Sequence, residues 1–131
     1  MDTAMNQKER MLAGLPYKAW LDGLTEEREE NKKRIYRYNN TPPEQGEELG
    51  ALIREIIGKC GKNIFIEPPF RCDYGSNIEV GENFFANYNL TILDVGKVTI
   101  GKNAQIAPNV SIFTAGHPVP VSYTHLRAHE T

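Results

Sequence analysis

The sequence predicts a mainly β fold, a solenoid of hexapeptide repeats that follows a helical N-terminal segment. The first observation is an aliphatic residue at every sixth position, namely Ile100, Ile106 and Ile112. Small residues follow two of them, at Gly101 and Ala107, as a tight corner between short strands requires. The second observation is a change of hydrophobic period near residue 63, from helical spacing to short β-type runs. Stacked repeats of this kind bury one continuous core.

The charge-rich residues 1–60 are expected to form a helical cap on the solenoid. A first short helix is expected at about residues 6–13. A second is expected to begin with Thr25 as its N-cap and to end at Asn39-Asn40. Acidic residues in its first turn and basic residues near its end suit the helix dipole.

A third helix has the clearest predicted start, because Thr41–Glu44 fits a capping box with proline in the first turn. Gly58 is the expected C-terminal stop. One face of this helix carries an apolar stripe, which indicates that it packs on another part of the protein. The stripe consists of Leu49, Leu52, Ile53, Ile56 and Ile57.

Residues 61–120 are expected to form an incomplete β-helix, with two extra residues near Val95–Lys97 that shift the repeat. So short a solenoid leaves its last turn uncovered, which favours further chain or partner subunits. A sandwich of short strands is the alternative interpretation. Residues 121–131 break the hexapeptide pattern and resemble translated adapter sequence, so we expect a non-native tail there.

Composition narrows the class of protein without naming its chemistry. The 131 residues carry 15 Lys+Arg against 17 Asp+Glu, and this balance indicates neither a nucleic-acid nor a membrane partner. No apolar run approaches the roughly 20 residues of a spanning helix, and no signal peptide is recognised. Cys60 and Cys72 form no CxxC pair, as expected in a reducing compartment. These observations predict a cytoplasmic protein.

Histidines are the first candidates for chemistry. His125 and His129 have the spacing of zinc ligands on a helix, but they lack the inner H-E-x-x-H motif and lie in the foreign-looking tail. We therefore expect no metal. His117 lies where the hexapeptides meet Gly116 and Pro118, at a corner or loop. Asn87 lies upstream in the same repeat, and stacked turns can bring such separated residues to one face.

Several motifs in this order resemble the family of maltose and galactoside O-acetyltransferases, which includes the nodulation acetyltransferases. The resembling segments are Arg37-Tyr38-Asn39, Glu67–Gly75, Asn83–Asn87, Leu93-Asp94, Ile106–Val110 and Gly116-His117-Pro118. The resemblance covers nearly all of residues 5–120. It implies a left-handed parallel β-helix that forms a homotrimer with active sites between subunits. It also implies transfer of acetyl from acetyl-CoA to a sugar hydroxyl.

The resemblance also implies roles for single residues. His117 matches the catalytic histidine, and an imidazole with a pKa of about 6.5 suits a general base. Asn87 matches the active-site asparagine, whose amide can donate to a developing oxyanion. The implied acceptor-binding residues are Asp73, Arg28, Asp94 and Phe85. No coenzyme-A-binding residue is assigned, since relatives form most of that groove from coils after residue 120.

The departures from the family concern the acceptor. Val95 replaces a second acidic residue of the galactoside enzymes, and Ala19 replaces an aspartate, so the identity of the acceptor sugar stays open. Because the chain stops near Pro120, an inactive fragment or a non-catalytic solenoid scaffold is the alternative function. A xenobiotic acetyltransferase is disfavoured by the cap. A zinc lyase on this fold needs three histidine ligands, whereas only His117 lies outside the tail.

Overall fold

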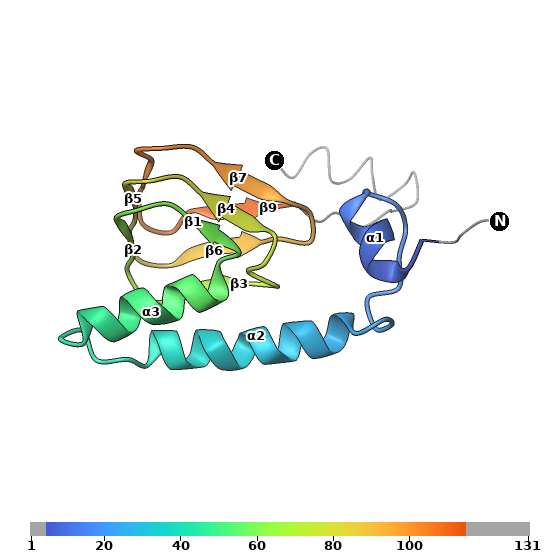
Figure 1. Ribbon diagram of the computed structural model, residues 1–131, viewed down its shortest axis with the longest axis horizontal. Helices are drawn as coiled ribbons and strands as arrows, with labels where there is room; N and C mark the ends of the chain where they lie inside the picture. Colours follow the sequence, from blue (N-terminus) through green and yellow to red (C-terminus); the bar gives the residue numbers. More distant parts are fainter. Residues whose placement is uncertain (1–4, 115–131) are drawn as a thin grey trace, which may run out of the picture.

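The computed structural model describes residues 5–114 and shows three helices followed by a stack of short strands (Figure 1). The helices are α1 (Gln7–Leu12), α2 (Leu24–Asn39) and α3 (Gly46–Ile56). The strands are β1 (Lys59–Cys60), β2 (Ile64–Ile66), β3 (Phe70–Cys72), β4 (Ile78–Val80), β5 (Phe84–Ala86), β6 (Leu90–Leu93), β7 (Val98–Ile100), β8 (Gln105–Ile106) and β9 (Ser111–Phe113). Among the described residues, no helix is both long enough and apolar enough to cross a membrane.

The strands form three parallel sheets, ordered β1-β4-β7, β2-β5-β8 and β3-β6-β9. Paired residues lie 20 positions apart, as in Lys59 with Glu79 and Ile92 with Ile112. One coil therefore consists of two hexapeptide steps and one step of eight residues. The predicted insertion near Val95–Lys97 is confirmed as the longer corner between β6 and β7. This architecture confirms the predicted left-handed parallel β-helix, and the sandwich alternative was wrong.

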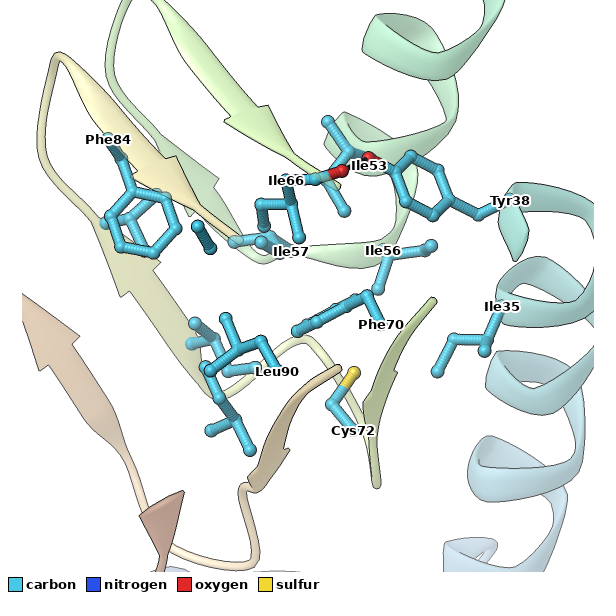
Figure 2. Close-up of a cluster of buried hydrophobic side chains, with 14 of the residues drawn as sticks. Ile35, Tyr38, Ile53, Ile56, Ile57, Ile66, Phe70, Cys72, Phe84 and Leu90 are labelled. Atoms are coloured by element: carbon cyan, nitrogen blue, oxygen red, sulfur yellow. Dashed lines mark hydrogen bonds between the residues drawn. The ribbon is translucent and has the colours of Figure 1, made fainter. Parts of the chain in front are cut away.

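Inward-facing side chains fill the prism and join the apolar stripe of α3 in one core (Figure 2). Phe70, Phe84 and Leu90 are at most 1% exposed, and burying such a side chain contributes about 1.5–3 kcal/mol. Burial declines along the stack, since Ile106 and Ile112 in the last described coil are only partly buried. The hexapeptide isoleucines thus face inward and pack against the core, as their spacing predicts.

Helix α1 confirms the first predicted helix, and α2 differs from prediction at its start. Asn6 caps α1 in a capping box with Glu9. The N-cap of α2 is Gly23, which adopts a left-handed conformation with a φ of 82°. The predicted cap Thr25 was wrong, because its hydroxyl lies inside the first turn and donates to the carbonyl of Ala19 at 3.5 Å. The chain therefore reverses before α2 without a side-chain cap.

The start predicted for α3 was also wrong. Thr41 serves the end of α2 instead, where its hydroxyl donates to the carbonyl of Arg37 at 2.6 Å. The third helix begins later, at Gly46, with Gln45 as its N-cap and no side-chain cap bond. It ends at Ile56, just before the predicted stop at Gly58. The apolar stripe of α3 is buried as its spacing predicts.

Asparagines at equivalent corners form ladders along the stack. Asn63, Asn83 and Asn103 all have positive φ values of 58–63°, a conformation that asparagine tolerates better than most residues. The amide Nδ2 of Asn63 donates to Oδ1 of Asn83 at 3.0 Å, and Asn83 donates likewise to Asn103 at 2.9 Å. Asn89 and Asn109 repeat this arrangement at 3.0 Å on a second corner. Each coil thus aligns the next.

Replacing Asn83 tests the ladder. We expect Asn83→Ala to lower the free energy of unfolding by about 1–2 kcal/mol, because alanine both strains the left-handed corner and removes the amide bonds. Asn83→Gly should lose less, since glycine relieves the strain. Urea denaturation measures both, with exposed Glu79→Ala on β4 as the control. An equal decrease in the free energy of unfolding for Asn83→Ala and Asn83→Gly would show that the left-handed backbone conformation at residue 83 does not contribute to the difference.

Gly81 lies where two coils approach closely. A Cβ atom built there would lie 2.8 Å from the backbone nitrogen of Lys102, whereas a Cβ at Gly50 in α3 would meet nothing within 4 Å. Gly81→Ala is therefore expected to lower the thermal midpoint. Gly50→Ala should raise it, because alanine favours a helix by about 0.8–1 kcal/mol over glycine. Calorimetry of the two variants checks these opposite signs; a loss in both would contradict the packing argument.

Candidate active site

The corner between β3 and β4 gathers the polar groups that face helix α2. Arg28 donates from Nη1 to the hydroxyl of Tyr74 at 2.6 Å, and its guanidinium lies 5.7 Å from the centre of that ring. Its Nη2 also donates to the carbonyl of Ala19 at 3.0 Å. One arginine therefore joins the loop before α2, helix α2 itself and the β3–β4 corner.

Asp73 precedes Tyr74 on the same corner and is partly buried. Burial raises the pKa of Asp73, and the positive charge of Arg28 opposes part of that rise. Burial likewise raises the pKa of Tyr74, against the hydrogen bond from Arg28. The structure thus brings together two of the predicted site residues, Arg28 and Asp73. Their guanidinium and carboxylate can donate to and accept from a ligand rich in hydroxyl groups.

The expectation that Asp94 contacts a ligand needs correction. Asp94 has no exposed surface, and its Oδ1 accepts from the backbone N–H of Asp73 at 3.0 Å and of Tyr74 at 2.9 Å. Its Oδ2 accepts from the N–H of Asn77 at 3.3 Å. Burial raises the pKa of Asp94, while these backbone donors lower it. The carboxylate is therefore occupied in holding the β3–β4 corner.

Phe85 and Asn87 lie on a different part of the prism. Phe85 is on the outer face of β5 and stacks on Phe65, with ring centroids 6.1 Å apart. Asn87 follows β5, and its Oδ1 accepts from the N–H of Tyr88 at 2.9 Å. The β5–β6 corner is thus separated along the coil from the corner that carries Asp73. His117 and the tail histidines lie outside the described residues.

Three polar residues of this region were missed by sequence reasoning: Asn31, Tyr74 and Asn77. Asn31 is fully buried, and its Nδ2 donates to the carbonyls of Cys72 at 3.3 Å and Asp73 at 3.1 Å. A signal for it exists in the sequence. Asn31 occupies a position in the buried stripe of α2, the other members being Leu24, Ile35 and Tyr38. A polar residue in such a stripe indicates a specific buried partner.

Neither a metal centre nor a reactive thiol is evident in this part of the protein. Within residues 5–114, no group of three or more His, Cys, Asp or Glu side chains could hold a metal ion. Burial raises the pKa of the Cys72 thiol to about 12, so the thiol stays protonated near neutral pH. Its Sγ accepts from Asn31 at 3.4 Å. Cys72 is therefore a packing residue.

Comparison with known proteins agrees with this architecture. A family model described as the maltose acetyltransferase hexapeptide capping motif matches residues 10–61. Galactoside O-acetyltransferase of Escherichia coli is 44% identical over 115 residues, which are 88% of this chain and 57% of that protein. The crystal structure of a maltose O-acetyltransferase from Clostridium difficile 630 superposes with a TM-score of 0.88 at 48% identity, covering 92% of this chain and 64% of that one.

A galactoside acetyltransferase solved in complex with coenzyme A superposes with a TM-score of 0.86 at 41% identity. The superposition covers 94% of this chain and 62% of the galactoside acetyltransferase chain. The chain thus spans about three-fifths of the length of the relatives it matches. Both the helical cap and the coils participate in these matches. The chain carries the maltose acetyltransferase capping motif, and over its helical cap and coils it is similar to the maltose and galactoside O-acetyltransferases, which are hexapeptide-repeat proteins.

Proposed function

We propose that this protein transfers an acetyl group from acetyl-CoA to a hydroxyl group of a sugar. The observation that carries the proposal is the pairing of Arg28 with the Asp73–Tyr74 corner, where cap and prism meet. Support comes from relatives that are named galactoside and maltose O-acetyltransferases. One of the similar structures contains coenzyme A. A carboxylate beside a guanidinium suits recognition of neighbouring sugar hydroxyls.

In the proposed reaction, Asp73 accepts a hydrogen bond from one hydroxyl of the sugar, and Arg28 donates to another oxygen. His117 removes the proton of the reacting hydroxyl while that oxygen attacks the thioester carbonyl carbon. The amide of Asn87 donates to the oxyanion that forms. When the intermediate collapses, the carbon–sulfur bond breaks, and the departing CoA thiolate receives the proton from His117. The products are the O-acetyl sugar and CoA.

We further propose that the site is shared between subunits of a homotrimer. The residues assigned to the reaction lie on two separated corners, with Arg28 and Asp73 at β3–β4 and Asn87 after β5. Two corners of one prism face away from each other, so one chain cannot bring both to one ligand. A neighbouring copy that presents its own β5–β6 corner would complete the set. Phe65 and Phe85, stacked on the outer face, supply apolar surface for such a contact.

His117→Ala tests the chemical step. We expect it to reduce acetyl transfer by roughly 10²–10⁴, because the general base is lost. The purified chain is incubated with acetyl-CoA and a panel of maltose, galactosides and glucose, and released CoA and sugar mass are measured. His125→Ala is the matched control and should be unchanged. Equal rates for His117→Ala and wild type would exclude the general-base role. Absence of acetylated product with every sugar would favour the scaffold.

Asp73 tests the acceptor contact. We expect Asp73→Asn to weaken sugar binding about 10-fold, since a charge-assisted hydrogen bond contributes more than a neutral one. Binding is followed by fluorescence of Trp20, the single tryptophan, which adjoins the Ala19 carbonyl held by Arg28. Because burial raises the pKa of Asp73, wild-type affinity should decline on acidification earlier than for an exposed aspartate. Asp73→Asn should lose this pH dependence, and Glu79→Gln should retain it.

A further inference from the structure

The backbone around Asp73 is held from two sides by buried polar side chains that take no part in the proposed chemistry. On one side, Asp94 accepts from the N–H groups of Asp73 and Tyr74 at 3.0 and 2.9 Å. On the other side, Asn31 donates to the carbonyl of Asp73 at 3.1 Å. Asp94 and Asn31 are both 0% exposed. The peptide groups on both sides of the Asp73 α-carbon are therefore fixed from inside the protein.

The chemistry of Asp94 suits this role in a way that asparagine does not. An ionised carboxylate only accepts hydrogen bonds, and each oxygen of Asp94 faces a backbone donor. An amide in the same place would turn its own N–H₂ toward one of these donors in either orientation. The side chain of Asn77 completes the arrangement by donating to the backbone carbonyl of Asp94 at 2.8 Å. The whole β3–β4 corner is thus built around one negative charge.

Asn31 couples this corner to the helix that carries Arg28. Residues three apart lie on one face of a helix, so Arg28 and Asn31 reach the same corner from adjacent turns of α2. Arg28 binds the side chain of Tyr74, and Asn31 binds the backbone just before it. The Oδ1 atom of Asn31 has no hydrogen-bond partner among the described residues. A leucine at this position would pack in the stripe without the cost of burying an unpartnered oxygen. This indicates that asparagine is present for the hydrogen bonds that its Nδ2 donates to the β3–β4 corner.

We propose that Asp94 and Asn31 are positioning residues that set the Asp73 carboxylate opposite the Arg28 guanidinium for binding of the acceptor. This inference rests on the proposed function, because Asp73 and Arg28 are its acceptor-binding pair. Neither positioning residue touches the ligand. Asp94 has no exposed surface, and Asn31 acts through the backbone of Cys72 and Asp73. Replacing either residue should therefore lower the affinity for the acceptor and leave the affinity for the acetyl donor unchanged.

The experiment compares Asp94→Asn and Asn31→Ala with Tyr38→Phe in the full chain. Tyr38 is a matched control, since it lies on the same helix, is 1% exposed and donates to a backbone carbonyl at Ile66, away from the site. Maltose and a galactoside serve as acceptor probes by Trp20 fluorescence, at a temperature where melting curves show each variant folded. We expect affinity to fall about 10- to 100-fold for Asp94→Asn and Asn31→Ala, and less than twofold for Tyr38→Phe.

Hydrogen exchange supplies a measurement that needs no sugar. The amides of Asp73 and Tyr74 should exchange at least tenfold faster in Asp94→Asn than in wild type. In Tyr38→Phe their exchange rates should be unchanged. Faster exchange with weakened sugar binding supports the inference. Unchanged exchange rates of these amides in Asp94→Asn would overturn it. An equal loss of sugar affinity in Tyr38→Phe would also overturn it. If wild type binds neither sugar, the proposed function fails, and the exchange data alone decide whether Asp94 holds the corner. Should Asp94→Asn not fold, the sugar affinity of Asn31→Ala relative to Tyr38→Phe decides, because Asn31 holds the carbonyl of Asp73 and not these amides.

Discussion

The structure depends on one constraint, the 20-residue register between parallel coils. Inward aliphatic side chains, the corner asparagines Asn63, Asn83 and Asn103, and the close glycines Gly61 and Gly81 recur 20 positions apart. A change of one residue in this count would turn core side chains outward, because side chains alternate between the faces of a strand. The Asn63–Asn83–Asn103 ladder and the tight approach at Gly81 both maintain the count. The register thus determines which residues can share a corner at all.

The part of the candidate site that contains Asp73 lies at the step that departs from the hexapeptide. A six-residue step turns the chain sharply, at a positive-φ asparagine in every such corner except β2–β3, which carries Pro68-Pro69. The eight-residue step between β3 and β4 provides a loop with exposed and buried polar groups together. Such a loop needs internal support, since its peptide groups lie beyond the strand ladders. Asp94 and Asn31 supply that support, and in doing so they orient the Asp73–Tyr74 corner toward α2.

Much of the fold could be predicted from sequence, and the failures have local causes. Periodicity identified the coils, the insertion near Val95 and the buried face of α3. Helix starts were less predictable, because Thr25 and Thr41 carry a cap's chemistry yet bond to Ala19 and Arg37. Residue type alone states which hydrogen bonds a side chain can form. It does not state which neighbour is present, and that depended on how the chain reverses before each helix.

The sequence by itself determined the solenoid and its helical cap, and its resemblance to a known family implied Arg28 and Asp73 as residues for a hydroxyl-bearing ligand. These conclusions follow from local periodicity and motif order, which can be recognised in the sequence without knowing any long-range contact. Only the tertiary structure decided that Asp94 is buried under the Asp73 corner and that Asn31 reaches it from α2. Asp73 and Asp94 are both aspartates beside strand ends, and nothing in their types separates a partly exposed carboxylate from a buried one. The stacking of coils makes that distinction, because it covers one side chain and leaves the other at the surface.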